Sequence, residues 1–210
     1  MSDARALVVI DYQNIHLTGH DCFVPKGVPK HESLIHPLTF ASLVVQKRQA
    51  IAGRNAMAGK TAPPSPRATL ASVKVYRGAP SNLHAPIPYA RSQAQRSEWT
   101  RDKRVEVVYR PLKYYSDGSA REKGVDVLVA INLVEAVRSG DYSVVILAAH
   151  DTDQEPALES ALTISQENGV ALETAGWEGS KVLKARGKRL WHTSLNGAEF
   201  VTARDRRNYD

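Results

Sequence analysis

Four aspartates stand where a shared metal site would need carboxylates. Asp11 ends the apolar run "ALVVID", and Asp151 ends a second run, "YSVVILAAHD". Asp153 follows two residues later, and Asp126 lies near the start of a segment with helical spacing. Carboxylates that converge repel one another unless a cation lies between them, and Mg²⁺ favours carboxylates, waters and phosphates as ligands. Together the four residues predict a site for a divalent cation.

Each of these residues also has a purely structural explanation. An aspartate at a strand end, such as Asp11 or Asp153, commonly caps the following helix. Asp126 can complement a helix dipole, and Asn14, three residues after Asp11, can cap the next turn. The combination favours a shared site over separate caps.

Alternating strands and helices are predicted to position these residues. Strands are predicted at 6–11, 72–78, 105–112, 142–151 and 170–176, and helices at 37–57, 125–138 and 155–168. Residues 59–69 predict a loop, and 79–99 a segment with a short helix after its prolines. This order predicts an α/β fold, a single Rossmann-like domain with a mainly parallel sheet and helices on both faces. Ligands bind outside the carboxyl ends of such strands, so Asp11 and Asp151 are expected to be neighbours.

The length and composition fit one domain of a cytoplasmic protein. A chain of 210 residues is long enough to bury a core. No apolar run reaches the roughly 18 residues of a membrane span, and the first residues lack the pattern of a signal peptide. Cys22 is the only cysteine, which excludes an internal disulfide and a cysteine-based zinc cluster.

Charge is distributed unevenly along the chain. Residues 42–104 carry 12 basic and 2 acidic side chains, residues 105–177 carry 5 and 12, and residues 178–210 carry 8 and 4. Basic segments on both sides of an acidic one suggest a polyanionic partner around a carboxylate-rich centre, with an ordinary solvated surface as the equal alternative. Candidates for an RNA track in the first basic segment are Arg91, Arg96, Arg101, Lys103 and Arg104.

Three ordered motifs resemble those of NYN domains, which belong to the PIN-like nuclease superfamily. "VVIDYQNIH" resembles the D-x-x-N opening, "KGVDVLVAINLVEA" the central K-x-V-D motif, and "YSVVILAAHDTDQEPALES" the strand, D-x-D and helix that follow. The resemblance implies a PIN-like nuclease domain over residues 1–177, with an acidic metal cluster of Asp11, Asp126, Asp151 and Asp153 that Asn14 supports. The family usually has S-G-D-S-D-F where this chain has A-H-D-T-D-Q at 149–154, so both acids remain while their neighbours differ.

The activity implied by the resemblance is metal-dependent hydrolysis of RNA. One or two Mg²⁺ or Mn²⁺ ions held by the aspartates would orient a phosphate and activate a water, so no side-chain nucleophile is required. The segment 109–124 interleaves tyrosines with basic residues, which suits the stacking of bases and the binding of a single-stranded backbone, although an ordinary exposed loop has the same composition. The expected nucleic-acid contacts are Arg110, Lys113, Tyr114, Arg121, Lys123 and His150.

Other functions remain open on the sequence alone. A D-x-D motif also serves sugar-nucleotide transferases, and acidic pockets at strand ends occur in phosphate-accepting receiver domains, but neither class needs Asp11, Asp126 and a D-x-D together. The main alternative is a non-catalytic RNA-binding or partner-binding module of the same fold. DNA stays open as a second substrate, and a homodimer as an alternative to a monomer.

Residues 178–210 are predicted to form a C-terminal extension with a final strand and a basic tail. "GKRLWHTS" at 187–194 predicts the strand, at the edge of the sheet or packed against it. The basic end contains Arg204, Arg206 and Arg207. Because charged termini are usually mobile, we expect removal of the last seven residues to leave stability nearly unchanged and to weaken nucleic-acid binding.

Overall fold

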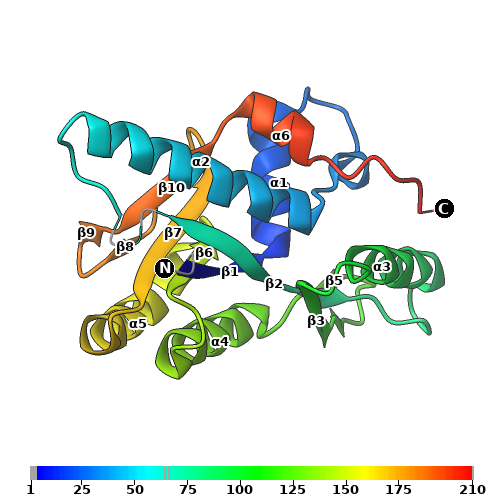
Figure 1. Cartoon of the computed structure of the whole chain (residues 1–210). Coiled ribbons are helices and arrows are strands. Elements are labelled where there is room, and N and C mark those ends of the chain that lie inside the picture. The colour runs from blue at the N-terminus through cyan, green and yellow to red at the C-terminus, as the bar shows by residue number, and fades with distance from the viewer. Residues whose placement is uncertain (1–3, 64, 66, 210) are drawn as a thin grey trace.

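A six-stranded parallel sheet forms the centre of the chain (Figure 1). The computed structural model describes residues 4–63, 65 and 67–209. The strands lie in the order β10-β7-β6-β1-β2-β3, and each neighbouring pair is parallel. Their bounds are β1 Ala4–Asp11, β2 Ala68–Ala79, β3 Val105–Pro111, β6 Val144–Ala148, β7 Ala171–Trp177 and β10 Trp191–Leu195.

The strand order reverses between β1 and β6. From β1 the chain moves outward through β2 to β3, and it then returns to β6 on the other side of β1 before moving outward again through β7 to β10. Such a reversal is the position at which open α/β sheets bind ligands, outside the carboxyl ends of the strands. Asp11 is the last residue of β1, and Asp151 follows β6 by three residues.

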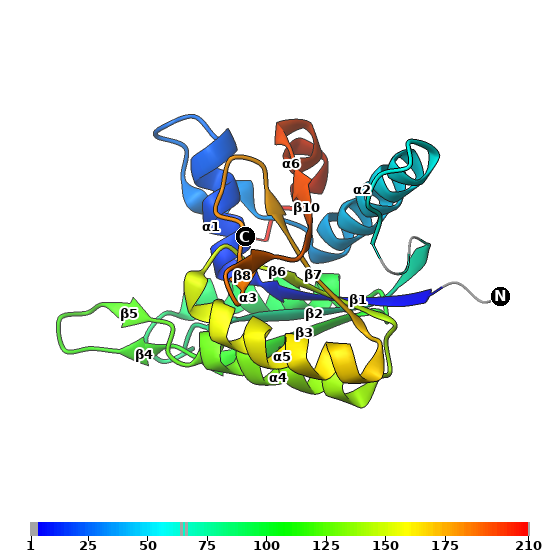
Figure 2. The same cartoon turned by 90° about the vertical axis from the view of Figure 1, so that its left-hand side faces the viewer.

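Helices cover both faces of the sheet (Figure 2). One face carries α1 Tyr12–Phe23, α2 Pro37–Met57 and α6 Gly197–Ala203, and the other carries α4 Val125–Ser139 and α5 Glu155–Asn168. Alternate residues of β1 enter the two cores, with Val8 in the first and Val9 in the second. A strand buried on both faces explains why "ALVVI" is apolar at every position.

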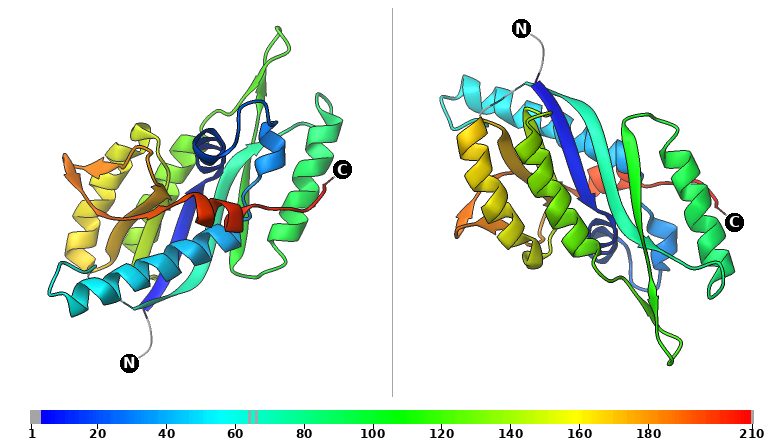
Figure 3. Two further views of the ribbon diagram at one scale, coloured as in Figure 1. Left: turned by 90° about the horizontal axis from the view of Figure 1, so that it is seen from above. Right: turned by 90° about the horizontal axis from the view of Figure 1, so that it is seen from below.

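Smaller elements lie at the edges of the domain. Helix α3, Pro86–Trp99, runs beside β3, and a hairpin of β4 Lys113–Tyr114 and β5 Ala120–Arg121 projects beyond the sheet (Figure 3). Two 3₁₀ turns are η1 Lys30–Ser33 and η2 Thr152–Gln154, and a second hairpin joins β8 Lys184–Ala185 to β9 Lys188–Arg189.

The predicted α/β class with a parallel sheet and helices on both faces is confirmed. The five predicted strands and three predicted helices all form, and the helix expected within 79–99 is α3. Helix α1 was not predicted. Among the described residues, no helix has the length and apolar character needed to cross a membrane.

The segment after residue 177 completes the same domain. The predicted final strand is split, because a turn at Arg186 and Gly187, both with positive φ, folds β9 back on β8 before β10 begins at Trp191. Strand β10 pairs with β7 at the sheet edge, and α6 buries Phe200 in the core. The chain therefore carries structural residues well beyond the stretch that resembles NYN domains.

Residues 204–209 are held against the fold, which argues against the expectation that the last seven residues contribute little to stability. Asp205 is 7% exposed, and its Oδ2 accepts hydrogen bonds from Trp99 Nε1 at 2.7 Å and from the Tyr209 hydroxyl at 2.6 Å. Arg204 forms an antiparallel bridge with Ile35. The Asp205 carboxylate thus fixes this tail to α3, and the backbone bridge fixes it to the segment after η1.

A buried ion pair joins α2 to the sheet. Arg48 donates from Nε and Nη2 to the Glu173 carboxylate at 2.7 and 2.6 Å, and both side chains are essentially inaccessible to solvent. Burial raises the pKa of Glu173, while the facing guanidinium lowers it and favours the charged form.

Candidate active site

An acidic pocket lies at the point where the strand order reverses. It has a volume of about 390 Å³, and four carboxylates from different parts of the chain line it: Asp11, Glu122, Asp126 and Asp151. Gln13, Asn14, Lys123, Gly124 and Val125 complete the lining. Three of the four predicted aspartates are therefore brought together, and the expected neighbourhood of Asp11 and Asp151 is confirmed.

Asp11 is the most deeply buried of these carboxylates. It caps α1, since its Oδ1 accepts a hydrogen bond from the Asn14 backbone N–H at 3.3 Å. The pKa of Asp11 is raised to about 7, chiefly by burial; the negative charges of Glu122, Asp151 and Asp126 add to the rise, and the hydrogen bond from Asn14 opposes it. Asp11 thus both caps α1 and lines the acidic pocket.

Asp126 and Asp151 lie at the N-termini of two helical elements, α4 and η2. Asp126 lies in the first turn of α4, directly after the turn at Gly124, which adopts a left-handed conformation. Asp151 caps η2. The side chain of Gln154 donates to the Asp126 carbonyl at 3.0 Å, which ties the start of α4 to the loop after β6 and holds the two acidic segments together.

Asp153 is not brought into the pocket with the other three. It lies in η2, its side chain is exposed, and its backbone N–H donates to Asp151 Oδ1 at 3.0 Å. The 3₁₀ turn that begins directly after Asp151 carries the next two residues to the surface. The prediction that Asp153 belongs to the same cluster as Asp11, Asp126 and Asp151 is therefore corrected.

Glu122 takes the fourth place, and the sequence analysis missed it. Its carboxylate accepts the Gly78 backbone N–H at 2.5 Å, and the Gln13 amide, with its nitrogen facing the carboxylate, donates to both oxygens at 2.8 and 2.7 Å. Burial raises the pKa of Glu122. It lies between β5 and α4, outside any periodic pattern, so only its place four residues before Asp126 could have drawn attention to it.

Asn14 lines the pocket and contacts the backbone of a neighbouring loop. Its Oδ1 accepts the His150 backbone N–H at 2.7 Å, which links the first turn of α1 to the loop that carries Asp151. This contact crosses the reversal point of the sheet and fixes the spacing between the two strand ends.

His150 does not fit the predicted role of a nucleic-acid contact. Its Nε2 accepts the Trp177 backbone N–H at 3.0 Å, so Nδ1 carries the proton and donates to the Lys181 carbonyl at 2.8 Å. Burial lowers the pKa of His150. The ring packs against Gly176, where a Cβ atom would lie 2.2 Å from it. Both ring nitrogens are used inside the fold, which corrects the prediction to a structural role.

The predicted basic contacts lie in the lining of the acidic pocket, beside it and on the projecting hairpin. Lys123 lines the pocket and is exposed. Arg110 donates from Nε to the Lys123 carbonyl at 2.8 Å. Lys113 and Arg121 are exposed cross-strand partners on the projecting hairpin, and each lies within 6 Å of the Tyr115 ring centroid, at 5.4 and 5.8 Å.

Tyr114 is held within the protein. Its ring stacks on His84 at a centroid distance of 4.4 Å, and its hydroxyl accepts the Ser81 backbone N–H at 2.8 Å. The stack forms part of a pocket of about 610 Å³ at the base of the hairpin. Tyr114 therefore already has a ring partner and a hydrogen-bond partner within the protein.

The acidic pocket fits a divalent cation by its chemistry, without offering a complete ligand set. Among the described residues, no group of three histidine, cysteine or acidic side chains is arranged to hold a metal ion. Mg²⁺ commonly binds through one or two carboxylates, retained waters and substrate phosphates, so it does not require such a group. Burial, together with the negative charges of Glu122, Asp151 and Asp126, raises the pKa of Asp11, and a bound cation would lower it.

Comparisons with known proteins assign no function. No family model matches the chain, and no curated protein matches it. A protein of unknown function from Vibrio parahaemolyticus is similar in structure, with 18% identity and a TM-score of 0.49 over 85% of both chains. A PLP-bound putative aminotransferase from Clostridium difficile gives a TM-score of 0.22 at 11% identity, over 81% of this chain and 37% of the other.

Proposed function

We propose that this chain is a metal-dependent ribonuclease whose active site is the acidic pocket. The observation that carries the proposal is the convergence of Asp11, Asp126 and Asp151, from three separate elements, on one pocket at the reversal point of the sheet. Helix capping alone would not require the three carboxylates to share a pocket. The resemblance to NYN domains supports the same residues.

Each residue of the pocket would have a separate role in binding the metal ion or the RNA. Asp11, Asp126 and Asp151 would hold a Mg²⁺ or Mn²⁺ ion, with Glu122 as an additional acceptor for its bound waters. When bound, the ion would polarise the scissile phosphate and lower the pKa of an attacking water. Lys123, exposed at the rim, would contact a neighbouring phosphate, and Asn14 would keep the two strand ends in register.

Cleavage of labelled RNA by the purified protein tests this proposal. Single-stranded and hairpin RNA would be incubated with Mg²⁺, Mn²⁺ or EDTA, and the fragments separated by electrophoresis. We expect cleavage with either ion and none with EDTA. Equal fragment yields with EDTA and with metal would contradict a metal-dependent site.

A non-catalytic RNA-binding module is the second candidate. It is favoured by one observation, that the projecting hairpin places the basic side chains of Lys113 and Arg121 beside the Tyr115 ring, a combination that could hold RNA without cutting it. Under this alternative the same assay would show RNA retained by the protein but intact at all metal concentrations.

A further inference from the structure

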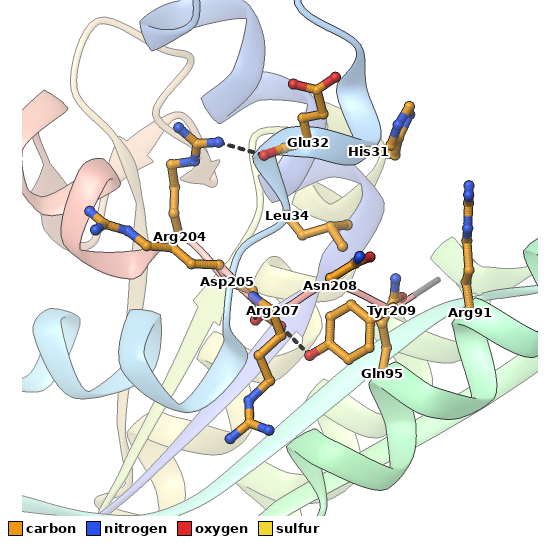
Figure 4. Close-up of a pocket in the computed structure, with 11 residues that line it drawn as sticks. His31, Glu32, Leu34, Arg91, Gln95, Arg204, Asp205, Arg207, Asn208 and Tyr209 are labelled. Atoms are coloured by element: carbon orange, nitrogen blue, oxygen red, sulfur yellow. Dashed lines mark hydrogen bonds between the residues drawn. The ribbon is translucent and has the colours of Figure 1, made fainter.

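Two basic segments that are far apart in the sequence meet at one pocket (Figure 4). This arginine pocket has a volume of about 540 Å³ and lies between η1, α3 and the C-terminal tail. Its basic residues are Arg91 from α3 and Arg204, Arg206 and Arg207 from the tail. The pocket therefore joins residues 42–104, with their large positive excess, to the basic end of the chain.

Positive charge exceeds negative charge in the lining. Four arginines face two acidic residues, Glu32 and Asp205. Arg207 pairs with Glu98 at 2.7 Å. Arg204 donates to the Glu32 backbone carbonyl, a neutral acceptor that does not neutralise the charge of the guanidinium. Asp205 is buried beneath the pocket. Arg206 is exposed, so a phosphate can approach it from solvent.

Aromatic and polar groups lie beside these charges. The Tyr209 ring stands within the pocket in Figure 4, held by the bond from its hydroxyl to Asp205. His31 lies at the edge. A phosphate-binding rim next to an aromatic ring is the combination by which proteins hold single-stranded nucleic acid, since every base offers a face for stacking.

A continuous set of contacts links the arginine pocket to the acidic pocket. Gln95 lines the arginine pocket and accepts a hydrogen bond from Arg77 Nη1 at 2.8 Å. Arg77 lines an intermediate pocket of about 410 Å³, whose wall includes Gln13 and Glu122. These two residues also line the acidic pocket. The intermediate pocket therefore shares two lining residues with the acidic pocket and is joined to the arginine pocket by one hydrogen bond.

We propose that the arginine pocket binds the backbone of single-stranded RNA that extends from the acidic pocket. The inference rests on the proposed function for the choice of RNA, and it adds a second binding site that cleavage chemistry does not require.

The test is binding of an oligouridylate of about 12 nucleotides, a length within the range of single-strand sites. Fluorescence anisotropy would be measured in EDTA from about 50 to 200 mM salt, the range over which phosphate contacts weaken strongly. The variant is Arg91→Gln/Arg206→Gln. Its matched control is Arg54→Gln/Arg138→Gln, which removes the same charge from exposed ends of α2 and α4.

We expect the pocket variant to weaken binding by about 10-fold and to reduce the salt slope by about 1.4, because each lost phosphate contact lowers the slope by about 0.7 for a single strand. The control should retain the affinity of the unmodified protein. Thermal melting of each variant shows whether it is folded, and Arg206→Gln alone should give about half of the slope change.

Equal affinities and slopes for the pocket variant and its control would overturn the inference. Because the measurement excludes metal, its result does not depend on cleavage. A protein that binds RNA through the pocket but fails to cut it would refute the proposed function and leave the arginine pocket standing. If the protein cuts RNA and the two double variants bind equally, the arginine pocket is refuted and the proposed function stands.

Discussion

Replacing Asp11 by asparagine should stabilise the metal-free protein at neutral and alkaline pH. The Asp11 carboxyl is buried beside three other acids, and its pKa is raised to about 7 in the folded state. Asparagine keeps an oxygen that can cap α1 in the same way. The substitution therefore removes the charge and retains the hydrogen bond.

The size of the effect follows from the difference in pKa. A rise from 3.8 to about 7 is about 3 pH units, and at about 1.4 kcal/mol per unit the ionised folded state is disfavoured by at most about 4 kcal/mol. Between pH 4 and pH 7 the folded state binds the proton that the unfolded state has lost. Stability of the unmodified protein is consequently lost as the pH rises through this window, and the penalty is complete above pH 7.

Thermal melting of both proteins in EDTA from pH 4 to pH 8.5 measures this difference. Comparison of variant with unmodified protein cancels the opposite effect of His16 and His192, whose pKa values are both lowered to about 4 by burial. We expect equal melting temperatures near pH 4 and a growing advantage for Asp11→Asn up to pH 7. At about 2 to 4 °C per kcal/mol, the gain is at most about 8 to 16 °C. An advantage that is absent at pH 8, or already complete at pH 4, would refute the reasoning.

Two further predictions concern stability. Arg48→Ala should lower the free energy of unfolding, measured in urea, by about 3 to 5 kcal/mol, because Glu173 is left buried without its partner. The double variant Arg48→Met/Glu173→Leu should cost much less. Equal losses for the two variants would show that the unpaired carboxylate is not the cause. Truncation after residue 203 should lower the melting temperature, since Trp99 loses the buried acceptor Asp205; an unchanged melting temperature would indicate that the tail does not hold the fold.

The sheet was predictable because its central strands are buried on both faces. Such strands need apolar residues at every position, and runs such as "ALVVI" and "VVILA" supply them. The placement of Asp11 and Asp151 then followed from parallel topology alone, since the carboxyl ends of neighbouring strands meet.

Contacts between distant side chains were not predictable in this way. Glu122 enters the pocket because the Gly78 backbone and the Gln13 amide hold it there, and neither partner is near it in the sequence. The short turn η2 turns Asp153 outward, although its spacing from Asp151 suits a shared ligand set. His150 lies next to an acidic residue but is committed to the backbone of β7 and of the segment after it.

Single-turnover cleavage of RNA in Mn²⁺ by Asp151→Asn tests the central claim most directly. The matched control is Asp141→Asn, which changes an exposed aspartate in the loop before β6, at the opposite end of the strands. We predict that Asp151→Asn loses more than the roughly 10- to 100-fold that the loss of a residue supporting a ligand costs, while Asp141→Asn cuts at the rate of the unmodified protein. Equal cleavage rates for all three proteins would contradict the assignment of the acidic pocket as a metal-dependent active site.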